Sequence, residues 1–350
     1  MSKCFPVFTW KFVCYTVALL VIGLSLRADP ETETGGVTND LLVLENASGR
    51  LVVSRHGGTV LEYRSHGLSS PLDVDWKLAE DSDKVPPPSP QSPHFGVKGH
   101  TTWVAPQDEW WKHQKIGPDR GRWPPDPWLT TAVYEIIRYS ETQLVLQSPK
   151  SPVSGVQMTK MFALLDDGRA EVDATITNIR DKDIQWGIWS NTRVNPHAVV
   201  LVPISENTPL KFEFETRTPL LTRAWDYEVT DGFWLTDTRG PYADAHKRGG
   251  KVFIDSAEGI AAAAYGNNIF IKRAISPTKV GKSAHGHATV EIFYHRASAT
   301  DILLELELHG PLINLLPGDS LLFRETWEIV SFEGEPTIEN IILSLRRHIK

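Results

Sequence analysis

The sequence predicts an all-β domain of sandwich type. About fifteen runs rich in β-branched and aromatic residues follow one another between residues 41 and 331, and Gly, Pro, Asn and Asp bound most of them. Helical patterns do not alternate with these runs, which excludes a parallel βαβ sheet. Because the turn signals are evenly spaced and no linker divides the region after residue 130, we expect one large domain over residues 41–335.

The predicted strands share one feature, a short β-prone run that ends at turn residues. They are Leu41–Glu45, Leu51–Ser54, Thr59–Arg64, Ala132–Tyr139, Gln143–Gln147, Val156–Leu165, Ala170–Thr177, Ile184–Ser190, Ala198–Ile204, Lys211–Glu215, Lys251–Asp255, Ile269–Arg273, Ala288–Tyr294, Ile302–His309 and Leu321–Ser331. Residues 81–94 carry five prolines and are predicted to form an extended, solvated loop. After the last strand, apolar residues recur at helical spacing behind Thr337, which predicts a short helix over residues 336–350.

Composition excludes several classes of protein. The 350-residue chain is 41% hydrophobic and 23% charged, as in ordinary globular proteins, which excludes a disordered or fibrous protein. Its 36 Lys and Arg against 43 Asp and Glu give a net charge of −7, so we expect no nucleic acid among its partners. Both cysteines, Cys4 and Cys14, precede the predicted domain, which is therefore expected to hold no disulfide and no cysteine-ligated metal. No metal and no cofactor are expected.

The N-terminal segment is typical of an export signal. Two lysines flank its start, and Val13–Leu26 is a nearly unbroken apolar run. This run is shorter than the roughly 20 apolar residues of a membrane-spanning helix. We therefore expect a signal peptide over residues 1–28, a polar linker over residues 29–40, and a secreted or periplasmic protein. An uncleaved N-terminal membrane anchor is the alternative.

The first candidate site is a segment rich in tryptophan and proline. Its five tryptophans fall within 26 residues and are Trp103, Trp110, Trp111, Trp123 and Trp128. With so much proline, we expect a structured loop rather than a regular strand or helix. Two interpretations remain open: the indoles plug one end of the sandwich, or they form a platform for sugar rings while polar neighbours bind sugar hydroxyls. The polar neighbours are His100, Gln107, Asp108 and Glu109.

A strand near the C-terminus provides the second candidate site. Alternation along Ile302–His309 places Glu305, Glu307 and His309 on one face, and the other face carries Ile302, Leu304, Leu306 and Leu308. Carboxylates two residues apart on one strand face lie about 7 Å from each other, close enough to shift each other's pKa on a partly desolvated surface. On a solvated face they form only a polar stripe, and the pattern alone leaves both interpretations open.

A third candidate site lies in the run from residue 184 to residue 195. Trp186, Trp189, Asn191 and Arg193 stand close together there, near the end of a predicted strand. An arginine beside Asn and Trp either clamps a ligand oxygen or carboxylate, or fixes a loop. The sequence favours neither.

Several of these segments occur in the order of an uncharacterised family. They are His56-Gly57-Gly58-Thr59-Val60, the stretch from Gly99 to Gln107, Trp123-Pro124-Pro125, the stretch from Trp189 to Val194, Glu305-Leu306-Glu307, Gly310-Pro311-Leu312 and Leu316-Pro317-Gly318. Over roughly residues 41–332 the chain resembles a bacterial domain-of-unknown-function family grouped with galactose-mutarotase-like proteins. The resemblance implies a galactose-mutarotase-like β-supersandwich with a carbohydrate cleft on its concave face, and a mono- or oligosaccharide ligand.

The wider resemblance to aldose 1-epimerases implies an acid–base site. Those enzymes place a Glu general base shortly before a Pro and a Leu-x-Pro-Gly turn, which Glu305 or Glu307 resembles, and an early His, which His100 resembles. Their general acid is a His in a Thr-Asn-His segment, where this chain has Ser190-Asn191-Thr192. Threonine cannot protonate a ring oxygen near neutral pH, so a histidine from elsewhere in the fold would have to replace it. The candidates for that replacement are His100, His197 and His309.

Three functions follow from these observations. The leading one is an exported carbohydrate-binding protein, with or without sugar-processing activity. The second is an aldose 1-epimerase-like or lyase-like enzyme that uses Glu305 or Glu307 with a histidine, and the third is a structural or interaction domain of the cell envelope.

The candidate catalytic residues are Glu305, Glu307 and His100, with Glu305 favoured for direct contact with the ligand. Burial beside tryptophans is expected to raise the pKa of Glu305, and a nearby Arg193 would oppose that shift. The candidate substrate-binding residues are Trp103, Gln107, Trp110, Trp123, Arg193 and His309.

Overall fold

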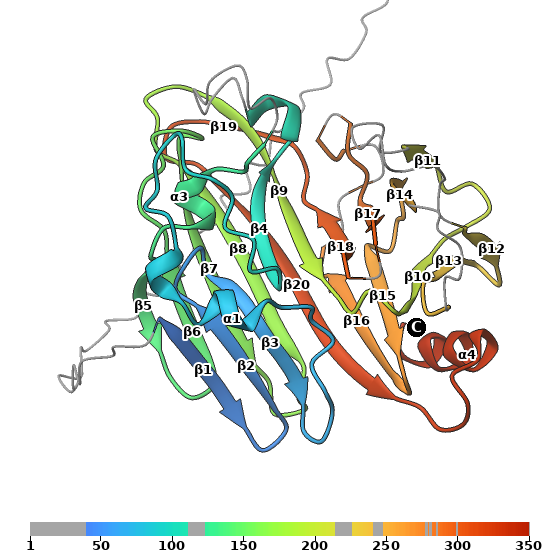
Figure 1. Ribbon diagram of the computed structural model, residues 1–350. Helices are drawn as coiled ribbons and strands as arrows, with labels where there is room; N and C mark the ends of the chain where they lie inside the picture. The colour runs from blue at the N-terminus through green and yellow to red at the C-terminus, as the bar shows by residue number, and fades with distance from the viewer. Residues whose placement is uncertain are drawn as a thin grey trace, which may run out of the picture. The chain divides into compact units, whose positions relative to one another are not determined.

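Two antiparallel sheets of ten strands each form the part of the chain that the structure describes (Figure 1). The structure is a computed structural model, and it describes residues 40–110, 123–213, 226–240, 248–276, 279, 282–284, 286–298 and 300–349. These residues belong to one unit, 39–350, whereas the predicted signal peptide and nearly all of the predicted linker lie outside the described residues. No helix among the described residues is long and apolar enough to cross a membrane. The prediction of an all-β sandwich with a C-terminal helix is confirmed.

The first sheet contains the strands that carry the candidate site. Its strands lie in the order β1 (Leu41–Asn46), β2 (Gly49–Ser54), β3 (Thr59–Ser65), β4 (His100–Ala105), β9 (Ile184–Arg193), β18 (Ile302–His309), β17 (Val290–Arg296), β14 (Arg248–Ile254) and β11 (Leu210–Glu213), and β19 (Ile313–Leu315) also pairs with β9. Strand β4 begins directly after Gly99, whose φ is +63°. A Cβ atom at Gly99 would lie 2.3 Å from the carbonyl oxygen of Val60, so only glycine allows β3 and β4 to approach here.

The second sheet packs behind the first. Its strands lie in the order β12 (Glu228–Thr230), β13 (Phe233–Asp237), β10 (Val199–Pro203), β15 (Ile260–Tyr265), β16 (Asn268–Ala274), β20 (Ser320–Ser331), β8 (Ala170–Asn178), β7 (Val156–Leu164), β6 (Gln143–Gln147) and β5 (Glu135–Tyr139). The described helices are α1 (Trp76–Ala79), α3 (Pro127–Thr130) and α4 (Ile338–His348), with 3₁₀ turns at Ser82–Lys84 and Gln107–Glu109.

Most predicted strands are present, but the expectation for the Trp-rich segment is wrong at its start. Residues His100–Ala105 form β4, in the middle of the first sheet. The prolines of the segment all follow Ala105, so the backbone donors of β4 remain available for ladder bonds. Strand β4 is buried on both faces and lacks the alternation that marks half-exposed strands. Trp128 lies in the short helix α3, and Trp111 lies outside the described residues.

Apolar side chains fill the space between the sheets and under the C-terminal helix. Leu306 of β18 and Trp327 of β20 belong to the same buried cluster, which joins the two sheets. Helix α4 packs Ile341 and Leu345 against a second buried cluster, on residues of the second sheet. The hydroxyl of Thr337 caps the start of α4, as the sequence predicts.

Two lysines are buried in the sandwich and bind backbone or hydroxyl groups there. The Nζ atom of Lys160 donates to the carbonyl oxygens of Gly57 (2.8 Å) and Gly58 (3.2 Å). Lys272 of β16 reaches Ser190 of β9, with 2.8 Å between Nζ and Oγ. Burial disfavours the charged form of each amine, which lowers the pKa of Lys160 to about 7 and that of Lys272 to about 8.

Replacing Lys160 by Met should therefore change how stability depends on pH. Between pH 7 and 10.4 the unfolded chain binds a proton at Lys160 that the folded chain does not bind, so this lysine makes the folded state more stable as pH rises. From pH 7.5 to 9.5, the unfolding free energy of the wild type should gain about 1.4 kcal/mol per pH unit relative to Lys160→Met. Urea unfolding of both proteins measures the difference. A difference that stays constant with pH would show that Lys160 remains charged when buried.

Candidate functional site

The face of the first sheet that points away from the sandwich core carries a band of polar and aromatic side chains. On β18, Leu304, Leu306 and Leu308 lie in the core, so alternation places Glu305 and Glu307 on the opposite face. His309 shares that face.

Antiparallel pairing arranges this band in three rows across neighbouring strands. Each row contains residues that are directly opposite one another in the ladder. The rows are Phe293, Glu305 and Arg193; Glu291, Glu307 and Asn191; and His309, Trp189 and Trp103. Residues of the second and third candidate sites, which are more than 100 positions apart in the sequence, therefore form one surface.

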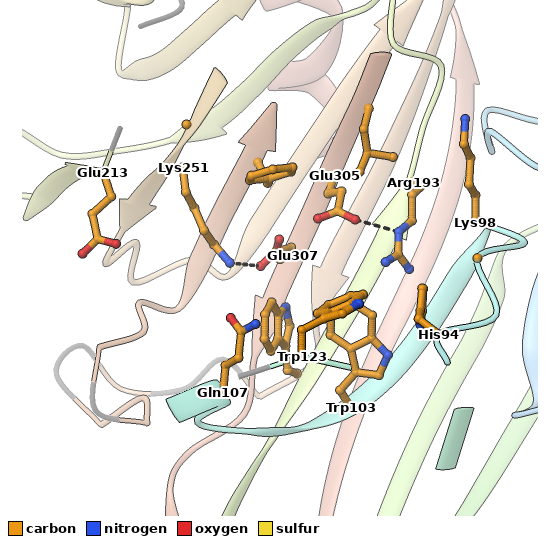
Figure 2. Close-up of a pocket in the computed structure, with 15 residues that line it drawn as sticks. His94, Lys98, Trp103, Gln107, Trp123, Arg193, Glu213, Lys251, Glu305 and Glu307 are labelled. Carbon is orange, nitrogen blue, oxygen red and sulfur yellow. Dashed lines mark hydrogen bonds and ion pairs between the residues drawn. The ribbon is translucent and has the colours of Figure 1, made fainter. Parts of the chain in front are cut away.

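A cavity of about 700 Å³ lies over this surface (Figure 2). Its size is in the range typical of small-molecule sites, about 300–1,000 Å³. The described residues that line it are His94, Gly96, Lys98, Trp103, Gln107, Trp123, Trp189, Arg193, Glu213, Gly250, Lys251, Phe293, Leu303, Glu305 and Glu307. Six of the nine candidate site residues are among them: Trp103, Gln107, Trp123, Arg193, Glu305 and Glu307.

A buried ion pair forms one part of the cavity wall. Nε of Arg193 donates to the Glu305 carboxylate at 2.7 Å, and Nη1 donates to the Thr101 hydroxyl at 2.6 Å. The guanidinium carbon lies 5.0 Å from the centre of a Trp103 ring, in cation–π geometry. Burial raises the pKa of Glu305 and Arg193 opposes that shift, as the sequence predicts.

The second carboxylate belongs to a larger charge cluster. The ammonium of Lys251 lies 2.6 Å from Glu307 and 2.5 Å from Glu291, and 4.4 Å from the centre of a Trp189 ring. Burial opposes ionisation of Glu291, but the charges of His309 and Lys251 hold its pKa well below the usual value. Burial also opposes protonation of His309, but Glu291 at 3.3 Å raises the pKa of His309. His309 thus belongs to this charge cluster, but it is not among the residues that line the cavity.

Two histidines and a carboxylate in this cluster are close enough to form a metal site, but their hydrogen bonds indicate an ion-pair network. Ligand atoms of His287, Glu291 and His309 all lie within 4.8 Å of one another. Nε2 of His287 accepts the backbone N–H of Gln107 at 3.4 Å, so Nδ1 carries the proton and donates to Glu291 at 2.9 Å. Lys251 already supplies a cation to Glu291. We therefore assign no metal to these residues.

The aromatic wall contains one exposed tryptophan and several buried ones. Trp110 is 1% exposed, donates its indole N–H to the carbonyl oxygen of Val104, and stacks on Trp189 at 5.8 Å. It does not line the cavity, so it fits the plug interpretation of the Trp-rich segment rather than the platform. Trp123 is 40% exposed and lines the cavity, with its ring 5.7 Å from that of Trp103.

The structure does not bring His100 to the cavity. Successive side chains of β4 point to opposite faces of the sheet, as in any strand. Thr101 therefore points to Arg193, while His100 points into the sandwich. Nδ1 of His100 lies 2.9 Å from the hydroxyl of Thr192, and its ring contacts Trp327 edge-on. Burial keeps the pKa of His100 well below its usual value, so this histidine is neutral.

Sequence reasoning missed three lining residues that carry polar chemistry. Lys251 follows Gly249 and Gly250 in β14, and no local sequence pattern connects it with Glu307. His94 comes from the Pro-rich segment that was predicted to be solvated, yet it packs 4.8 Å from Trp123. Burial, and to a lesser degree Arg193, lower the pKa of His94 to about 3. Lys98 lies just before β4 and pairs with Asp73 at 2.7 Å.

Comparisons with known proteins agree with the fold. The sequence matches the family described as Domain of unknown function (DUF4380) over residues 40–330. A putative aldose 1-epimerase from Escherichia coli K12 has a similar structure, with a TM-score of 0.51, 13% identity, and coverage of 83% of this chain and 99% of that one. A galactose mutarotase-like protein from Lactobacillus casei has a TM-score of 0.51 at 12% identity, covering 83% and 100% of the two chains. A search of curated proteins gave no match. The predicted galactose-mutarotase-like fold is confirmed.

Substitution of the buried Trp110 and of the exposed Trp123 should lower the unfolding free energy by different amounts. Trp110→Ala empties a buried site and removes a hydrogen bond, so the unfolding free energy should fall by about 3–5 kcal/mol. Trp123→Ala removes a ring that is already partly hydrated and should cost about 1–2 kcal/mol. Denaturant unfolding measures both values. Equal losses would contradict the different roles assigned to the two rings.

Proposed function

The chain belongs to the DUF4380 family, and we propose that it binds a mono- or oligosaccharide in the cavity over the first sheet. One observation carries the proposal: a cavity of about 700 Å³ brings an exposed indole ring and two carboxylates together in its lining. The ring is that of Trp123, which is 40% exposed, and the carboxylates are those of Glu305 and Glu307. An apolar surface beside a few convergent polar groups is typical of small-molecule sites.

The lining also suits the two kinds of surface that a sugar presents. Trp123 offers an exposed aromatic face to the C–H groups of a pyranose ring. Glu305 and Glu307 can accept hydrogen bonds from hydroxyl groups, while Arg193 and Lys251 can donate to sugar oxygens. A likeness in fold to a putative aldose 1-epimerase and a galactose mutarotase-like protein supports the same class of ligand. We also propose, from the N-terminal apolar run, that the protein acts outside the cytoplasm.

An enzymatic role on the same sugar is the second candidate, because two carboxylates share the cavity and burial raises the pKa of one of them, Glu305. Anomer interconversion needs a base for the C1 hydroxyl proton and an acid for the ring oxygen. Of the histidines considered from the sequence, none lines the cavity. His94 does line it, but with its pKa lowered to about 3 it is unprotonated near neutral pH and cannot serve as the acid. Binding is therefore the function that the described residues support best, and polarimetry on freshly dissolved sugars tests for catalysis.

The binding proposal predicts that Trp123→Ala weakens glycan binding. A glycan array with the purified protein identifies a bound sugar, and calorimetry then compares variants with the wild type. Loss of one stacking face should cost on the order of 1 kcal/mol, or about a fivefold to tenfold rise in Kd. The matched control is Trp76→Ala, since Trp76 is 38% exposed on α1 and does not line the cavity.

Two results would contradict the proposal. If the folded wild type binds no glycan on the array, a structural or interaction domain becomes the better account. If Trp76→Ala weakens binding as much as Trp123→Ala, the sugar binds elsewhere on the surface.

A further inference from the structure

We propose that Glu305 is a specificity-determining residue that occupies Arg193 and thereby excludes sugars carrying a carboxylate, sulfate or phosphate group. The cavity would then accept uncharged sugars only. This inference rests on the proposed carbohydrate-binding function and adds the charge class of the ligand.

Every described cation that lines the cavity already has a carboxylate partner within hydrogen-bonding distance. Lys98 pairs with Asp73 at 2.7 Å, and Arg193 pairs with Glu305 at 2.7 Å. Lys251 lies 2.6 Å from Glu307 and has a second carboxylate at 2.5 Å. An anionic sugar therefore finds no unpaired cation among these residues.

An anion that entered the cavity would also meet negative charge. The side chains of Arg193 and Glu305 are only 6% and 9% exposed, so water screens their charges poorly. A ligand carboxylate would have to displace the carboxylate of Glu305 from Arg193 and then remain beside it and near Glu307. Like charges brought together in a binding site repel each other and suppress binding, whereas a hydroxyl group binds the same carboxylates without that repulsion.

The two ion pairs differ in one respect that makes the inference testable. Beyond Glu305, the described side-chain contacts of Arg193 are neutral: the hydroxyl of Thr101 and the ring of Trp103. Lys251, in contrast, keeps the carboxylate of Glu291 when Glu307 is lost. Removing the charge of Glu305 therefore leaves a guanidinium without a carboxylate in the cavity wall, whereas removing the charge of Glu307 leaves Lys251 neutralised.

The experiment compares Glu305→Gln with its matched control, Glu307→Gln, two residues away on the same strand face. Calorimetry measures the binding of sugar pairs that differ only at C6, such as galactose with galacturonate and glucose with glucuronate. The wild type and Glu307→Gln should prefer the neutral member at least about tenfold. In Glu305→Gln that preference should fall at least about tenfold, because the uronate gains Arg193 as a partner. The double variant Glu305→Gln with Arg193→Gln should lose the gain for uronates.

A second probe makes the result independent of sugar binding. Acetate binding is followed by chemical-shift changes in the NMR spectrum of each variant, and only Glu305→Gln should bind acetate. If no sugar binds to any protein but Glu305→Gln binds acetate, the proposed function fails while the role of Glu305 stands. If sugars bind but Glu305→Gln and Glu307→Gln show the same neutral-to-uronate ratio, the role of Glu305 is refuted. Circular dichroism checks folding, and if Glu305→Gln does not fold, equal affinity of the wild type for the two members of a sugar pair still refutes the inference.

Discussion

The carboxylates of Glu291, Glu305 and Glu307 are buried on the outer face of one sheet, and a buried carboxylate costs several kcal/mol unless a cation neutralises it. The register of the first sheet meets this constraint. It places Arg193 directly opposite Glu305 and brings Lys251, two strands away, between the other two carboxylates. A shift of one residue in the pairing of β9 with β18 would turn Arg193 into the core and leave Glu305 without its cation.

This pairing of charges explains why the surface can be both buried and polar. The carboxylates remain hydrogen-bond acceptors with a fixed orientation, because Arg193 and Lys251 hold them in place. The aromatic wall adds the rings of Trp103, Trp123 and Trp189 to this polar surface. A ligand that carries many hydroxyl groups and no charge can satisfy such a surface without disturbing its ion pairs. The two proposals made for the cavity therefore depend on the same arrangement of charges.

The sequence predicts the architecture well because short β-prone runs end at turn residues, a signal that does not depend on which face of a strand is buried. It predicts the face of β18 because Leu304, Leu306 and Leu308 alternate with polar residues. Strand β4 was missed because the prolines that follow Ala105 make the whole Trp-rich segment resemble a loop, and the direction of His100 was missed with it. Neighbouring residues of a strand point to opposite faces, so a strand at His100–Ala105 with Thr101 on the outer face requires His100 to point toward the core.

Residues that come from distant strands or irregular segments could not be predicted in the same way. Lys251 reaches Glu307 only through the pairing of β14 with β17 and of β17 with β18, which no local pattern records. His94 enters the cavity from a Pro-rich segment whose composition indicates only a loop. The resemblance to aldose 1-epimerases gave the fold and the carboxylate strand, but the chain lacks the mid-chain histidine, and the structure places Thr192 beside His100 in the interior.

A crystal structure of the protein with a bound glycan tests the central claim most directly. The account predicts a sugar in the cavity over the first sheet, with the C–H face of a ring against Trp123 and at least one hydroxyl within hydrogen-bonding distance of Glu305 or Glu307. The Arg193–Glu305 ion pair should remain intact in that complex. A sugar bound elsewhere on the protein, or one that separates Arg193 from Glu305 to bind its own charged group, would contradict the account.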